Sequence, residues 1–211
     1  MRQRIPALMF LVGLILMWMQ ACAPRISPEK SCNFVLNSFD QRVSWDNRVP
    51  VHMLIHESVP IAFHQALVDA ARWWNEKAGK DLILVGLDVV RGPIEPRQDG
   101  YSIMYFMNTW EQDPEHLLEQ ARTSIFWKGT QIIEADIRFN FYKYGKSFSF
   151  AEPVPGNMID IRSLAIHEFG HVLGFGHIDD PDSVMIKYLA NGEDRSLFAG
   201  VIEQDSLSCE Y

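Results

Sequence analysis

Residues 167–177 read HEFGHVLGFGH, and the residues before them are suited to begin a helix. Asp160 is a good N-cap because its side chain can accept a hydrogen bond from the first helical turn. Gly174 can end the helix because glycine adopts the left-handed backbone conformation without steric cost. The pattern therefore predicts a helix from Ile161 to about Leu173 that carries most of this stretch.

Three histidines of this stretch have the spacing of a metal site. His167 and His171 are four residues apart, so they project from one helix face and can bind one ion. The turn at Gly174 lets His177 approach from outside the helix. Three neutral imidazoles leave a fourth position for water, which is typical of catalytic zinc sites. We therefore predict one catalytic Zn²⁺ on these histidines, with Glu168 as the base that takes a proton from the water.

The alternative is that these histidines have no metal to bind. A short His-Glu-x-x-His pattern can occur by chance on a helix, and buried histidines are often hydrogen-bonded core residues. The stretch fixes five positions at once, which favours the metal site. The other central histidines lack ligand spacing to this stretch and are expected to be exposed or hydrogen-bonded: His52, His56 and His64.

The extended pattern resembles the signature of the metzincin zinc peptidases. Met185 follows His177 by eight residues, where the matrixin branch of that clan has the methionine of its Met-turn. The likeness covers roughly residues 49–211. Within it, residues 133–140 (IEADIRFN) look like the strand before the active-site helix in bacterial matrixin-like peptidases, and residues 160–167 resemble the entry to that helix.

This resemblance implies an α+β fold with a twisted, five-stranded, mostly parallel sheet, one antiparallel edge strand and three helices. It also implies a zinc metalloendopeptidase that cleaves proteins or peptides bound in an extended conformation. Residues 122–127 would be the edge strand that pairs with the substrate backbone. The substrate-binding candidates on the strand and the pocket wall are Arg122, Thr123, Ser124, Ile125 and Tyr188.

The competing hypothesis is a non-catalytic, zinc-stabilised module that keeps this fold and binds peptides or a partner protein. Such a module is expected to have lost Glu168 or a ligand, and both are present. A thermolysin-like enzyme needs a distant glutamate as third ligand, a place that His177 already fills. The loop over 108–120 offers only Asp113 and His116 as plausible ligands, so neither a second metal nor a structural calcium is predicted.

The resemblance also bears on the cysteines. Metzincin-like folds bring the first strand and the last helix near each other, which favours a disulfide between Cys32 and Cys209 in an oxidising compartment. Two unpaired thiols are the alternative, and Cys32 could instead face the zinc. The sequence alone does not decide the pairing.

Residues 1–22 have the layout of an export signal, with Arg2 and Arg4 before an apolar run over 5–19. A transmembrane helix is the weaker alternative because the run is shorter than the roughly 20 residues that span a bilayer. The end of the run, Met-Gln-Ala-Cys, resembles a bacterial lipobox, so Cys22 is a candidate for lipidation and membrane attachment. We therefore expect an extracytoplasmic protein, either secreted or a membrane-anchored lipoprotein.

Residues 23–48 are expected to be a tether and entry segment, and residues 49–211 one catalytic domain that acts as a monomer. Removing residues 1–22 deletes two arginines and no acidic residue, which changes the formal net charge from -8 to 17 minus 27, or -10. Such an acidic chain argues against nucleic acid as a partner. Periodicity predicts strands at 49–55, 82–90, 101–107, 122–127 and 131–141, and helices at 61–78, 161–173 and 194–207.

Overall fold

The computed structural model describes residues 31–211. The expected signal peptide, the lipidation candidate Cys22 and the first residues of the tether lie outside this range. Within residues 31–211, no helix is long and apolar enough to cross a membrane.

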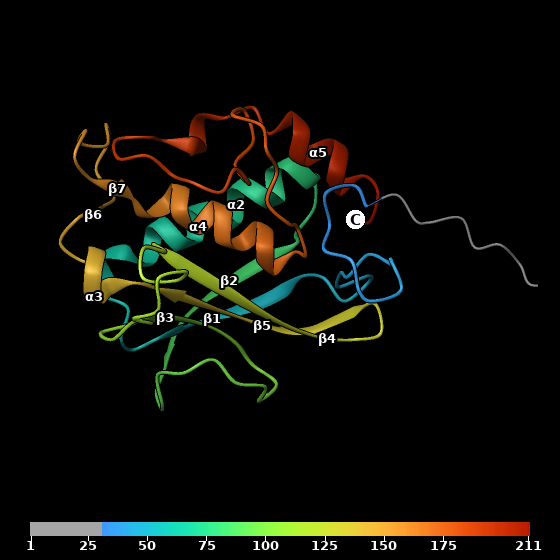
Figure 1. The fold of residues 1–211 in the computed structure, drawn as a ribbon, viewed down its shortest axis with the longest axis horizontal. Helices are drawn as coiled ribbons and strands as arrows, with labels where there is room; N and C mark the ends of the chain where they lie inside the picture. The colour runs from blue at the N-terminus through green and yellow to red at the C-terminus, as the bar shows by residue number, and fades with distance from the viewer. Residues whose placement is uncertain (1–30) are drawn as a thin grey trace, which may run out of the picture.

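A five-stranded sheet with the strand order β2-β1-β3-β5-β4 forms one layer of the domain (Figure 1). Neighbouring strands pair in parallel except β4 and β5, which pair antiparallel. This confirms the expected mostly parallel sheet with one antiparallel edge strand. The strands are β1 (Val51–His56), β2 (Ile83–Val90), β3 (Ser102–Phe106), β4 (Ala121–Lys128) and β5 (Gln131–Phe139).

Three longer helices accompany the sheet, and α2 and α4 cross one of its faces (Figure 1). They are α2 (His64–Ala78), α4 (Ile161–Val172) and α5 (Val201–Leu207). Trp74 of α2 is fully buried, and its indole N–H donates to the Ile166 carbonyl of α4 at 2.8 Å. This contact fixes the two helices against each other on that face of the sheet.

The expected helix over 194–207 is wrong in its first half. Asp194 instead caps a short 3-10 helix at Arg195–Leu197, and α5 begins only at Val201. Gly200 interrupts the helical path because its φ is +69°. Smaller elements that we did not expect are α3 (Phe141–Tyr144) and a two-stranded sheet of β6 (Phe148–Ser149) and β7 (Ile159–Asp160).

β4 and β5 form the hairpin that the sequence indicates, and Gly129 makes its turn with a φ of +66°. Because β4 is the last strand of the sheet order, its second edge has no strand partner among the described residues. That free edge runs beside α4 (Figure 1).

Residues 32–48, expected to be an entry segment, lie against the same core as the sheet and helices. Phe34, Val43 and Trp45 are buried there. A disulfide joins Cys32 to Cys209 and so ties the start of this segment to the end of the chain. Cys32 therefore does not face the metal site, which removes that alternative.

Candidate metal centre

α4 begins where the sequence predicts. The Asp160 carboxylate accepts hydrogen bonds from the backbone N–H of Ser163 at 2.9 Å and from its hydroxyl at 2.6 Å. The helix ends at Val172, and Gly174 turns the chain back with a φ of +101°. Nearly the whole helix is buried, so its histidines are held on a rigid element.

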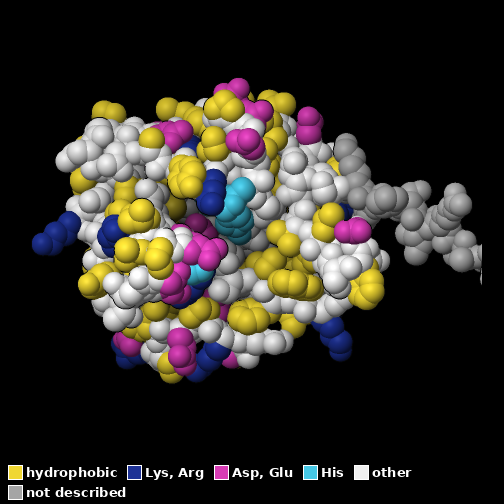
Figure 2. Space-filling view, viewed as in Figure 1, with side chains coloured by type: hydrophobic (Ala, Val, Ile, Leu, Met, Phe, Trp, Pro, Cys, Tyr) yellow, Lys and Arg dark blue, Asp and Glu magenta, His cyan; other side chains and the backbone are white. Residues whose placement is uncertain are grey.

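The structure brings the three predicted ligands together. The ring centroids of His167 and His171 are 4.7 Å apart. The ring centroid of His177 lies 5.3 Å from that of His167 and 4.8 Å from that of His171. Each ring offers a nitrogen within 4.8 Å of the other two. Figure 2 shows histidine side chains at the floor of a hollow in the surface.

Hydrogen bonds decide which ring nitrogens are free. Nδ1 of His167 lies 2.9 Å from the Val184 carbonyl, and Nδ1 of His171 lies 2.8 Å from the Phe175 carbonyl. A carbonyl only accepts, so both Nδ1 atoms carry the hydrogen and both Nε2 atoms keep a lone pair. Burial lowers the pKa of His167 and lowers that of His171 to about 4, so both rings are neutral at neutral pH.

These neutral rings fit a zinc ion. The two Nε2 atoms face each other at 3.1 Å with no proton between them, an arrangement that a cation would stabilise. Two nitrogen ligands of a tetrahedral zinc, each about 2.0–2.1 Å from the metal, lie about 3.3 Å apart. The separation and the donor chemistry therefore both match the predicted metal.

Glu168 lies beside the ligands and is 3% exposed. Its Oε2 accepts a hydrogen bond of 2.6 Å from the Thr123 hydroxyl, which reaches across from β4. Burial raises the pKa of Glu168 to about 7, and the bond from Thr123 opposes this rise. The carboxyl group therefore lies between the zinc helix and the edge strand, where a hydrogen bond from β4 holds it.

Met185 is fully buried, and the carbonyl of its neighbour Val184 lies 2.9 Å from Nδ1 of His167. It packs so closely on Gly170 that a Cβ added to the glycine would lie 2.1 Å from the methionine sulfur and 2.9 Å from the Trp74 ring. Gly170 therefore permits the contact between the zinc helix and the turn below it.

Replacing Gly170 by alanine is expected to destabilise the domain. Overpacking typically costs about 1–3 kcal/mol, and the better helix propensity of alanine offsets at most about 1 kcal/mol. We expect thermal unfolding to show a Tm lower by about 2–6 °C. The control is Gly156→Ala, since a Cβ there meets nothing within 4 Å. Equal Tm values for both variants would contradict the packing argument.

Two buried charged residues that we did not predict hold the Met-turn. The Glu203 carboxylate accepts from the Ser183 hydroxyl at 2.6 Å and from the Val184 N–H at 3.0 Å. Arg195 is 1% exposed and donates to the carbonyls of Val184 and Ile186, each at 3.2 Å. No sequence signal marks either residue, because each bonds to a turn that the fold brings to it.

A cleft of about 700 Å³ lies over the histidines, between β4 and the loop after the Met-turn. Of the predicted substrate-binding residues, four line it: Arg122, Thr123, Ile125 and Tyr188. Ser124 is not among the residues that line the cleft. Lining residues that we did not predict include Val35, Leu118, Glu119, Trp127, Lys187 and Leu189.

No part in metal binding was expected for three other histidines: His52, His56 and His64. His52 is exposed. The imidazole of His56 lies 3.0 Å from the Ser58 hydroxyl, and that of His64 lies 3.1 Å from the Val59 carbonyl. They are therefore exposed or hydrogen-bonded, as expected.

Comparison with known proteins agrees with this geometry. The model of the matrixin family of peptidases matches residues 33–206. A stretch of 85 residues is 32% identical to matrix metalloproteinase-25 of Mus musculus and covers 39% of this chain but only 13% of that relative. The family match includes all three histidines, Glu168 and Met185. The chain therefore belongs to the matrixin family of metallopeptidases.

Proposed function

We propose that this protein is a zinc-dependent endopeptidase that hydrolyses peptide bonds of proteins or peptides outside the cytoplasm. The observation that supports this most strongly is the pair of Nε2 lone pairs of His167 and His171 that face each other at 3.1 Å beside Glu168. All of these groups open into a cleft bordered by the free edge of β4.

The residues of the site have separate roles in this proposal. His167, His171 and His177 would hold Zn²⁺, which would lower the pKa of a bound water molecule and polarise a carbonyl group. The Glu168 carboxylate accepts a proton from the attacking water and returns it to the leaving amine. The Thr123 hydroxyl, on the neighbouring strand β4, holds the carboxylate in position.

The cleft suits an extended peptide. The backbone N–H and C=O groups on the free edge of β4 can pair with an added strand, which gives affinity without requiring one sequence. Acidic side chains gather on one side of the histidines and hydrophobic ones on the other (Figure 2). The hydrophobic part of the lining includes Val35, Ile125 and Trp127, and the acidic part includes Glu115 and Glu119. We therefore propose substrates with apolar residues on one side of the cleaved bond.

Replacing Thr123 by valine is expected to lower kcat by about tenfold, since a hydrogen bond to a charged group contributes about 1.5–3 kcal/mol. The bond favours the charged carboxylate, so its loss should raise the pKa of Glu168 and move the acidic limb of the pH–rate profile to higher pH. The matched control is Thr130→Val, an exposed threonine in the β4–β5 turn. Superimposable profiles for both variants would contradict the positioning role of Thr123.

The test of the proposal is digestion of an unstructured protein such as casein by the secreted domain in water enriched in ¹⁸O. Hydrolysis places ¹⁸O in the new carboxyl termini, which mass spectrometry detects. We expect labelled fragments, their loss after chelation and their return when Zn²⁺ is added. Bound zinc without cleavage of a broad substrate set would instead favour the non-catalytic binding module.

A further inference from the structure

We propose that two disulfide-linked segments, residues 32–45 and 201–211, here called the two ends of the described chain, position the third metal ligand, His177, so that Cys32 and Cys209 act as positioning residues for the metal site. This inference rests on the proposed function only in taking zinc as the metal. It concerns how firmly the ion is held, and it does not depend on whether peptides are cleaved.

His177 is held differently from the other two ligands. The Nδ1 atoms of His167 and His171 bond to backbone carbonyls, whereas the ring of His177 makes no hydrogen bond to another residue of the described chain. The ring is also exposed. Its position therefore depends on the backbone on either side of it. After the ring, the Ile178 N–H donates to the Met185 carbonyl at 3.0 Å, and before it lies the turn over residues 173–176.

That turn is bound by the N-terminal segment. The Val35 N–H donates to the Gly174 carbonyl, and the Gly176 N–H donates to the Asn33 carbonyl, both at 2.8 Å. The Phe34 and Phe175 rings stack between these bonds with centroids 4.5 Å apart. The bonded residue Gly176 directly precedes His177, so the N-terminal segment fixes the backbone at the ligand.

The end of α4 also depends on both chain ends. A helix leaves its last carbonyls without partners inside the helix. Here the Val172 carbonyl accepts from the Trp45 indole at 2.7 Å, and the Leu173 carbonyl accepts from the Tyr211 hydroxyl at 2.6 Å. Together with the bond from Val35, three successive carbonyls before His177 are satisfied by residues from the two ends of the chain.

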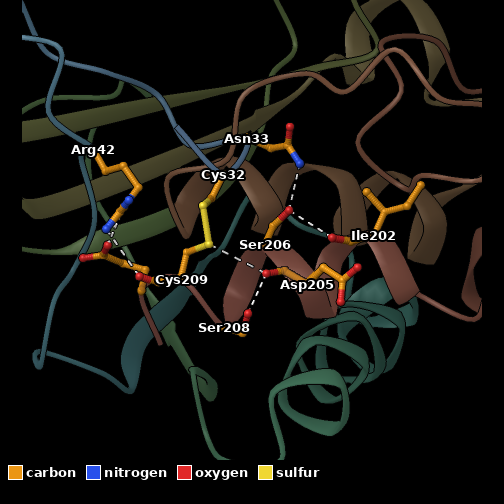
Figure 3. Close-up of a disulfide and its surroundings, with 9 residues drawn as sticks. Cys32, Asn33, Arg42, Ile202, Asp205, Ser206, Ser208 and Cys209 are labelled. Carbon is orange, nitrogen blue, oxygen red and sulfur yellow. Dashed lines mark hydrogen bonds and ion pairs between the residues drawn. A yellow bond between two sulfur atoms is a disulfide. The ribbon is translucent and has the colours of Figure 1, made fainter. Parts of the chain in front are cut away.

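The disulfide holds these two ends in one place (Figure 3). Beside it, the Asn33 side chain donates to the Ser206 hydroxyl of α5 at 2.8 Å. The Arg42 guanidinium pairs with the Glu210 carboxylate at 2.9 Å. Without the covalent link, only such non-covalent contacts would keep the N-terminal segment on the turn. Its bonds to Gly174 and Gly176 would then open more often, and His177 would leave the metal more often.

The experiment measures the rate at which zinc passes from the folded full chain to a chromogenic chelator. The Cys32→Ser/Cys209→Ser variant is expected to release zinc at least about tenfold faster than the native chain. The control is Ile83→Ala, which removes a fully buried side chain from β2 without touching the ends of the chain. It should release zinc within about twofold of the native rate. The inference is overturned if the double variant releases zinc at the same rate as the native chain or at the same rate as Ile83→Ala.

A milder variant decides the matter if the double variant fails to fold. Tyr211→Phe removes the donor to the Leu173 carbonyl and keeps the disulfide, and we expect zinc release about threefold faster. Its matched control is Tyr142→Phe, whose hydroxyl makes no hydrogen bond within the described chain and whose residue is 62% exposed. Release at the same rate by both variants would contradict the positioning role of the chain ends.

A second readout separates this inference from the proposed function. Hydrogen exchange at the Gly176 amide should be faster in the double variant than in Ile83→Ala, because that amide donates to the N-terminal segment. A chain that binds zinc and cleaves nothing would sink the proposed function and leave this inference standing. If the native chain cleaves peptides but the double variant shows native zinc release and native exchange at Gly176, the inference fails and the proposed function stands.

Discussion

Replacing Glu168 by glutamine is expected to lower kcat for peptide hydrolysis by about 10²–10⁴-fold while one zinc ion per chain stays bound. The amide keeps the size of the carboxyl group and cannot accept the proton of the attacking water. None of the three ligands changes, so metal content should be unaffected. The measurements are steady-state rates on a peptide substrate and zinc content by elemental analysis.

The matched control for this prediction is Glu115→Gln. Glu115 also lines the cleft, but its side chain is 84% exposed and lies 4.0 Å from His116, which is not one of the three ligands. The same change there should leave kcat within a few-fold of the native value. If Glu168→Gln retains native activity, the proposed proton transfer is wrong, even if the chain remains a zinc enzyme.

Loss of the Cys32–Cys209 disulfide is expected to lower the free energy of unfolding by about 3–5 kcal/mol. The two cysteines are 177 residues apart, so the bond removes a large amount of conformational entropy from the unfolded chain. Urea unfolding of the Cys32→Ser/Cys209→Ser variant should therefore show a lower midpoint than that of the native chain.

The native chain unfolded under reducing conditions is the control for this prediction, since it lacks the same bond without any substitution. Its midpoint should match that of the double variant. A change below about 1 kcal/mol in both samples would mean that the disulfide contributes little to folding.

The sequence predicted those parts of the site that depend on residues close together in the chain. His167 and His171 share one helix, and both its N-cap Asp160 and its terminating turn at Gly174 are visible in the sequence. The β4–β5 hairpin could also be predicted from the sequence, because its two strands are separated by a short turn that contains a glycine. The mostly parallel sheet with one antiparallel edge strand was implied by the resemblance to metzincins, and the order of its strands was not predicted, since periodicity does not fix which strands pair.

Contacts between segments that are distant in the chain could not be predicted from the sequence. Thr123 meets Glu168 across 45 positions of the chain, and Arg195 is buried although arginine is usually exposed. The start of α5 was missed because the pattern over 194–207 continues through Gly200, and only the folded backbone shows that this glycine is left-handed. In each case tertiary contacts decided what local preference left open.

The most direct test of the central claim is the dependence of peptide cleavage on zinc occupancy. The purified protein is freed of metal with a chelator and then titrated with Zn²⁺ while cleavage of an unstructured protein is followed. We expect the cleavage rate to rise in proportion to added zinc and to level off at one ion per chain. Undiminished cleavage by the metal-free chain, or no cleavage at full occupancy, would contradict it.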